Sequence, residues 1–325
     1  MKSINFLKLQ ACALALGTAL AAHAQDPYPT QTVTLLVSAA PGGTTDLAAR
    51  MIADPLSKAL GKPVVVDNRP GGAGVIAASA VKRAKPDGYT LLVQYSGYQV
   101  ITPHVMKAPF DPVKDFAPVA NLIVAPQVMV VRPDLPIKTL PELVGYARAH
   151  PGKLSYASSG NGSLQHVTGE MINQIAGVNL THVPYKGTGP ALTDMLGGTV
   201  DLTFTTAPPL LGHIKTGKLR PLAITGNVAL PSLPNVPTTS GIKGFEKLDV
   251  SSWFAVYAPA GTPKPVIDRL SGEIRKIMET AEFKSKAEAQ GAYAVYMNPQ
   301  ELAEHTGRQL QYWGKFVKEA KITAD

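Results

Sequence analysis

A buried strand that runs into a glycine turn and then into a helix is the feature that most constrains this chain. Residues 33–38 are rich in Val and Leu, a Pro-Gly-Gly turn follows at 41–43, and an amphipathic segment begins near Asp46. In an open α/β sheet, ligands bind at the loop that leaves the carboxyl end of such a strand. Glycine lets the backbone approach a ligand closely, and the first N–H groups of the next helix attract negative charge. We therefore predict that this turn is one jaw of a clamp for a small anion.

The same strand-turn-helix pattern recurs along the chain. In the first part, strands are expected at residues 64–67 and 89–95, separated by the glycine-rich turn at 68–74 and an alanine-rich helix. Further on, strands are expected at 154–158, 180–183, 200–205 and 219–225, again with helices between them. This alternation favours parallel sheets with helices on both faces.

Two extended segments predict how the chain passes between lobes. Residues 121–132 can carry it out of the first lobe, and the strand at 252–257 can carry it back. We expect two α/β lobes with the second inserted in the first: residues 26–125 plus 253–325 form lobe 1, and residues 126–252 form lobe 2. A proline inside the helix at 46–60, Pro55, predicts a kink or break. Capping boxes are expected where Thr139 and Asn298 begin helices.

The first 24 residues have the pattern of a cleaved signal peptide. Lys2 and Lys8 make a positive region, residues 11–22 form a short apolar run, and Ala22-His23-Ala24 has the A-x-A form of a cleavage site. We expect cleavage after Ala24 and export to the periplasm. A second apolar run near twenty residues is missing, so no permanent membrane anchor is expected.

Composition narrows the chemistry of the mature chain. The single cysteine, Cys12, falls in the signal segment, so no disulfide or thiolate site is expected. Without Lys2 and Lys8, 29 basic residues stand against 23 acidic ones, a net charge of +6 that attracts anions. The basic residues are scattered, and nucleic acid is therefore not an expected partner.

Motifs for enzymes and cofactors are weak or missing. Residues 72–77 match G-x-G-x-x-A after a strand, but the acidic residue expected about 20 positions further on is not there, and Asp87 comes too early. Five histidines show no metal-ligand spacing: His23, His104, His150, His213 and His305. Neither HExxH nor G-x-S-x-G occurs. We therefore predict a protein that is not an enzyme and holds neither a metal nor a cofactor.

Four turns that follow strands form the candidate binding site, two in each predicted lobe. Their small or hydroxylated residues supply the N–H and O–H donors with which a carboxylate can replace its water. Ser163 is also expected to cap the helix that ends at Gly177, Asp46 either meets the ligand or only caps its helix, and His166 faces either ligand or water. His182 is expected to be a structural histidine. The predicted ligand-binding residues are Pro41, Gly42, Gly43, Asp46, Ser96, Tyr98, Ser158, Ser159, Asn161, Gly162, Ser163, His166, Thr205, Thr206 and Ala207.

Seven short motifs, in order along almost the whole mature chain, resemble one family: the Bug-type solute receptors of tripartite tricarboxylate transport systems. The motifs are Pro-Gly-Gly at 41–43 with Asp46, Asn-Arg-Pro-Gly at 68–71, Pro-Asp-Gly-Tyr-Thr at 86–90, Ser-Gly-Asn-Gly-Ser at 159–163, His-Val-Pro-Tyr-Lys-Gly at 182–187, Gly-Gly-Thr-Val-Asp at 197–201 and Ala-Pro-Ala-Gly-Thr-Pro at 258–263. Each motif alone is weak, whereas the ordered set is specific.

The resemblance implies a periplasmic binding protein of type II architecture, in which two lobes joined by two crossing strands close on a small carboxylate, often with bridging waters. It implies no chemistry, a membrane permease as partner, and a monomer. Tyr98 is bulkier than the small polar residues expected at its turn, and if it faces the cleft, an aromatic or longer ligand can stack on it. The ligand therefore stays open between an amino acid, a di- or tricarboxylate and an aromatic acid. A sensory module for the same ligands and an exported hydrolase stay as alternative functions.

Overall fold

The computed structural model describes residues 28–323, and from Gln31 onward the described chain forms one compact unit. The predicted signal peptide, residues 1–24, and its cleavage site lie outside the described residues. Among residues 28–323, no helix combines the length and the apolar character needed to cross a bilayer.

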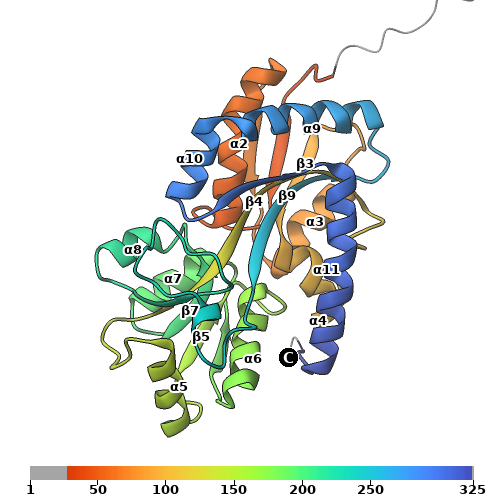
Figure 1. The fold of residues 1–325 in the computed structure, drawn as a ribbon. Helices are drawn as coiled ribbons and strands as arrows, with labels where there is room; N and C mark the ends of the chain where they lie inside the picture. Colours follow the sequence, from red (N-terminus) through yellow and green to blue (C-terminus); the bar gives the residue numbers. More distant parts are fainter. Residues whose placement is uncertain (1–27, 324–325) are drawn as a thin grey trace, which may run out of the picture. The chain divides into compact units, whose positions relative to one another are not determined.

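Strands and helices alternate through most of the chain, as the sequence pattern predicts (Figure 1). The strands are β1 (Val33–Val37), β2 (Val64–Asn68), β3 (Thr90–Tyr95), β4 (Phe116–Val131), β5 (Ser155–Ser158), β6 (Thr181–Pro184), β7 (Leu202–Thr206), β8 (Arg220–Ile224), β9 (Ser251–Pro259) and β10 (Tyr293–Met297). The helices are α2 (Thr44–Leu60), α3 (Val75–Lys82), α4 (Thr102–Val105), α5 (Leu140–Ala149), α6 (Leu164–Ala176), α7 (Thr188–Leu196), α8 (Leu211–Lys215), α9 (Lys264–Glu279), α10 (Ala281–Ala289) and α11 (Pro299–Glu319). Short turns of other helix types are η1 (Gly72–Gly74), η2 (Gly97–Ile101) and η3 (Thr239–Gly241).

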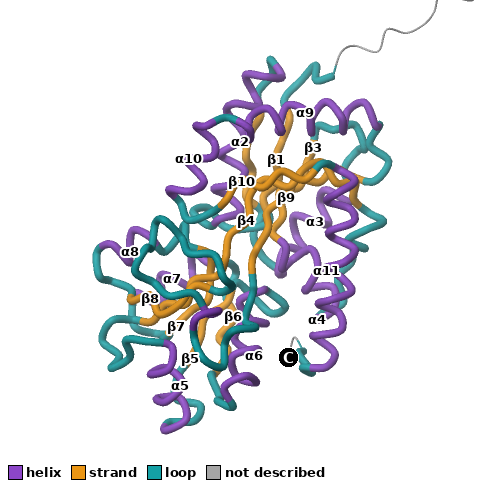
Figure 2. The backbone as a smooth tube through the Cα atoms, viewed as in Figure 1, coloured by secondary structure: helices purple, strands orange, loops and turns teal. Residues whose placement is uncertain are grey.

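The strands form one curled sheet with the order β2-β1-β3-β9-β4-β7-β5-β6 (Figure 2). Strand β1 pairs in parallel with β2 and β3, and β5 pairs in parallel with β6 and β7. Between these two parallel groups run β4 and β9, which are antiparallel to each other and to their outer neighbours. The expectation of two α/β lobes joined by two crossing strands is confirmed. The lobe boundaries stay a prediction.

Strand β4 is long enough to pair with strands of both lobes. Its first part pairs with β9, from Phe116 opposite Pro259 to Pro126 opposite Ser251. From Gln127 onward the same strand pairs with β7 and β8. One continuous strand therefore belongs to both lobes and joins their backbones.

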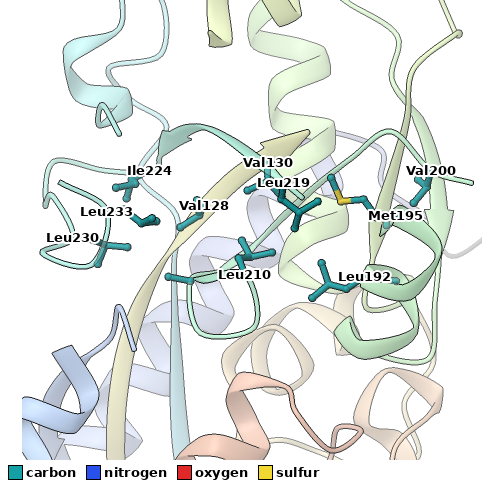
Figure 3. Packing of buried hydrophobic residues seen from close by; sticks show 13 residues of the cluster. Val128, Val130, Leu192, Met195, Val200, Leu210, Leu219, Ile224, Leu230 and Leu233 are labelled. Carbon is teal, nitrogen blue, oxygen red and sulfur yellow. The ribbon is translucent and has the colours of Figure 1, made fainter. Parts of the chain in front are cut away.

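Helices cover the sheet and bury its apolar residues. In the β1–β3 part, α2 packs against α9, and α11 packs against α4 on the other side of the strands (Figure 1). In the β5–β7 part, Val128 and Val130 of β4 join Leu192 and Met195 of α7 in a buried apolar cluster (Figure 3). These two cores hold the carboxyl ends of the strands, where the turns of the predicted site begin.

Local sequence signals predicted most elements but not every detail. Helix α2 runs unbroken through Pro55, so the expected break is wrong; a single proline removes only one hydrogen bond of a 17-residue helix. Only one of the two hydrogen bonds of the expected Thr139 capping box forms. Thr139 accepts from the Glu142 N–H, but the Glu142 carboxylate accepts from Lys138, one residue before the cap.

The last helix begins with a complete capping box, as predicted. The Asn298 side chain accepts from the N–H groups of Gln300 and Glu301, and the Glu301 carboxylate accepts from the Asn298 N–H. The helix then packs its buried residues against β4. The cap therefore fixes where this long helix starts.

Replacement of Asn298 by Ala should destabilise the fold by about 1 kcal/mol, because two N–H groups at the start of α11 lose their acceptor. The measurement is the midpoint of urea unfolding. The matched control is Gln300→Ala, which removes an exposed side chain of the same turn and leaves the cap intact. Equal midpoints for the two variants would show that the cap does not stabilise the helix.

Candidate functional site

A small cavity of about 30 Å³ lies between the two parallel groups of strands. Its walls come from both lobes and from the crossing strand β9. None of the lining side chains carries a formal charge. The lining residues are Ala39, Ala40, Gly43, Thr44, Thr45, Tyr95, Tyr98, Ser159, Gln165, Gly187, Thr188, Thr205, Thr206, Ser252 and Phe254.

Two helices begin at the cavity wall without a side-chain cap. Helix α2 starts at Thr44 after Gly43, and α7 starts at Thr188 after Gly187, and neither glycine can supply a capping oxygen. Gly187 also has a φ of 120°, a left-handed conformation that favours glycine. The first N–H groups of a helix have no acceptor within the helix, and its dipole favours negative charge there. Both helix starts can therefore donate to an anion in the cavity.

Hydroxyl groups from the two lobes meet across the cavity. Thr44 Oγ1 and Thr206 Oγ1 lie 2.5 Å apart. Gln165 Nε2 donates to Thr205 Oγ1 at 3.3 Å, and Ser159 Oγ donates to Gln165 Oε1 at 2.9 Å. The cavity wall is thus a network of neutral donors whose hydrogen bonds fix their directions.

Two tyrosines from the β3 side reach the start of α6 on the other side. Tyr95 Oη accepts from the Leu164 N–H at 2.6 Å and donates to Gln165 Oε1 at 3.1 Å. Tyr98 Oη donates to the Ser159 carbonyl oxygen at 2.8 Å. Burial raises the pKa of Tyr95, and it raises the pKa of Tyr98 to about 12, so both phenols stay protonated. These hydrogen bonds join the β3 side of the cavity to the start of α6 in the described structure.

Five of the residues predicted to bind ligand line this cavity: Gly43, Tyr98, Ser159, Thr205 and Thr206. The other ten are placed around it without lining it. They are Pro41, Gly42, Asp46, Ser96, Ser158, Asn161, Gly162, Ser163, His166 and Ala207.

Asp46 holds the first turn in place. Its carboxylate accepts from the Gly42 N–H at 3.1 Å, from Arg50 Nε at 3.0 Å and from Asn68 Nδ2 at 3.0 Å. Burial alone would raise the pKa of Asp46, but these hydrogen bonds, led by that from Arg50, hold it below its usual value. The carboxylate therefore fastens the glycine turn beside the cavity.

Serines at the other turns also make hydrogen bonds that shape the wall. Ser163 caps α6 by accepting from the His166 N–H, as predicted, and α6 ends at Gly177. Ser96 Oγ accepts from the Trp253 N–H of β9 at 3.2 Å. Ser158 Oγ lies 2.6 Å from His182 Nε2.

The two histidines of this region stack on each other behind the turn at 158–163. Their ring centroids are 4.0 Å apart with an angle of 4° between the planes. His166 Nδ1 accepts from the Gly162 N–H at 3.2 Å, which requires that nitrogen to be unprotonated. Burial lowers the pKa of both rings, that of His182 to about 3 with a further contribution from His166. A neutral histidine pair thus supports the turn.

Ten lining residues were missed by the sequence prediction, and some of them had a readable signal. Thr44 and Thr45 directly follow the predicted Gly42-Gly43 turn, and Tyr95 ends the strand before Ser96. No local sequence signal indicated Gln165 or Ser252, because they reach the cavity only through packing between segments far apart in the sequence.

Acid should weaken the fold through this stacked pair. An unfolded histidine has a pKa of about 6.5. His182 therefore takes up a proton on unfolding when the pH lies between about 3 and that value, and stability falls as pH drops through this window. We expect His182→Asn to reduce the slope of unfolding free energy against pH by up to one proton, about 1.4 kcal/mol per pH unit.

Urea unfolding at several values between about pH 4 and pH 7 measures this slope. The control variant is His150→Asn, which changes an exposed ring stacked on Tyr146. Identical slopes for wild type and His182→Asn would contradict the assignment.

Among residues 28–323, no group of three or more His, Cys, Asp or Glu side chains is placed to hold a metal ion. In the described site, the groups available to an anion are therefore neutral hydrogen-bond donors and the starts of two helices.

Comparison with known proteins agrees with this fold. Residues 48–322 match the family model described as tripartite tricarboxylate transporter family receptor. The solved structure of the periplasmic binding protein BugD is 34% identical, covers 91% of this chain and 99% of its own, and has a TM-score of 0.85.

Two further solved structures contain carboxylates. R. palustris Rpa4515 with adipate is 35% identical, with coverages of 91% and 99% and a TM-score of 0.87. MatC from Rhodopseudomonas palustris with bound malate is 31% identical, with coverages of 89% and 100% and a TM-score of 0.83. The type II periplasmic binding protein fold is thus confirmed, and the chain belongs to the receptor family of the tripartite tricarboxylate transporters as a Bug-type receptor.

Proposed function

We propose that this protein is a periplasmic receptor that captures a small organic carboxylate by closure of its two lobes and delivers it to a membrane transporter. The observation that carries the proposal is the cavity between the lobes, whose walls present hydroxyl donors and the uncapped starts of α2 and α7. Adipate and malate, the ligands in two similar structures, are both dicarboxylates.

The donors at the wall are of the right order in energy for such a ligand. A hydrogen bond to a charged group contributes about 1.5–3 kcal/mol, and a helix start about 0.3–1 kcal/mol. A handful of donors from the fifteen lining residues therefore reaches the binding free energy of a micromolar ligand, about 8 kcal/mol, before the costs of association are subtracted. A buried arginine is not required for this sum.

The remaining predicted residues have a supporting role in this proposal. Asp46 and Ser163 hold the turn before α2 and the start of α6, and His166 with His182 supports the turn at 158–163. The same proposal includes waters that bridge ligand and protein and a signal peptide cleaved after Ala24. It also includes a monomeric receptor without catalytic activity. The partner is a membrane permease, and the lobes are residues 26–125 plus 253–325 and residues 126–252.

A screen of mono-, di- and aromatic carboxylates should find at least one that raises the melting temperature, because a ligand that binds only the folded state stabilises it. Calorimetry then gives its affinity. Gly43→Val should abolish this binding with the fold intact: Gly43 has a φ of −80°, and a Cβ there meets only the Ala40 carbonyl at 3.5 Å, so a side chain is tolerated at the cavity wall.

The matched control is Gly272→Val on α9, where a Cβ meets nothing within 4 Å. It should bind like wild type. No stabilisation by any carboxylate would overturn the proposed function. Unchanged affinity in Gly43→Val would overturn the location of the site.

A further inference from the structure

We propose that Tyr98 determines the length of the carboxylate that this receptor accepts, and that it restricts the site to short chains. The inference rests on the proposed function and concerns the selectivity of the same cavity. Its basis is the position of the Tyr98 ring, which lines the cavity and bridges the two lobes.

The backbone places Tyr98 by an unusual turn. Strand β3 ends at Tyr95, and the chain continues as the π-helical turn η2, in which Tyr98 is the second residue. Turns of this type are rare and frequently occur at functional sites. Here the turn directs a large side chain to the cavity wall, where it is only 3% exposed.

Gly74 and Tyr95 pack against the Tyr98 ring and fix its position. Gly74, with a φ of +83°, lies so close that a Cβ on it would be 2.6 Å from Tyr98 Cδ2. The ring also meets the Tyr95 ring edge-on, with centroids 4.6 Å apart and an angle of 74°. Because both sides are filled, the Tyr98 ring cannot withdraw from the cavity without displacing buried groups.

The hydroxyl closes the same wall. Tyr98 Oη donates to the Ser159 carbonyl, so the ring spans from η2 to the turn before α6. The remaining space is about 30 Å³, far below the roughly 300–1,000 Å³ of pockets that hold drug-sized ligands. Beside this wall there is room for a carboxylate group with a short chain. A dicarboxylate of adipate length then needs this wall to give way.

The experiment measures affinities by calorimetry for acetate, propionate and butyrate and for the linear dicarboxylates from malonate to adipate. Wild type should prefer the short members of each series. Tyr98→Ser removes the ring, so longer members should gain relative to short ones by about fourfold for each methylene newly buried. Tyr98→Phe keeps the ring and loses only the bond to Ser159. It should weaken all ligands by a similar factor of about five and leave the length preference unchanged.

The outcomes separate this inference from the proposed function. If wild type binds carboxylates but Tyr98→Ser keeps the wild-type length preference, Tyr98 does not set the length and the inference is overturned. A wild type that already prefers adipate overturns it as well. If no carboxylate binds to wild type, the proposed function itself fails. Melting temperatures within a few degrees of wild type confirm that the variants are folded, and Tyr98→Leu serves in place of Tyr98→Ser if that variant unfolds.

Discussion

A carboxylate that leaves water must find replacement donors, and the proposed function depends on this requirement. An ionised group buried without partners costs far more than a folded protein can tolerate. The donors that the cavity presents are neutral: hydroxyls of Thr44, Thr205 and Thr206 and the N–H groups that begin α2 and α7. Such donors require that several strand ends converge on one point. The parallel strands on each side provide that convergence, since their carboxyl ends lie at the same edge.

The proposed closure involves the crossing strands as much as the turns. Strand β4 pairs with β9 over its first part and with β7 over its last, so both lobes share one continuous backbone. Strand β9 brings Ser252 and Phe254 to the cavity floor between them. Ligand binding that favours the closed form stabilises it in proportion to that preference. In the proposed closure, the hydrogen bonds Tyr98–Ser159 and Thr44–Thr206 add to what the ligand contributes.

Local patterns predicted the parts of the fold that depend on local chemistry. The strand-turn-helix units, the Ser163 cap and the Asn298 capping box all follow from residues within a few positions of each other. Helix α10 was not predicted because only Phe283 and Ala287 of its nine residues are buried, which leaves hardly any stripe. Strand β10 was missed because all its residues are half-buried and show no alternation.

The site was predictable only to the level of its turns. Five of fifteen predicted residues line the cavity, and they lie in the predicted turns or, for Thr205 and Thr206, at the end of strand β7. Tyr95 and Gln165 meet across 70 positions of sequence, a contact that no local pattern encodes. Likewise, the stacking of His166 on His182 turns a candidate ligand contact into a support for its turn.

A crystal structure with a bound carboxylate tests the central claim most directly. We expect both oxygens of the carboxylate to lie within hydrogen-bond distance of hydroxyl or backbone N–H groups from the two lobes, including the starts of α2 or α7, with no Arg or Lys side chain in contact. A carboxylate held by a lysine or arginine, or one bound away from the cavity between the lobes, would contradict the account.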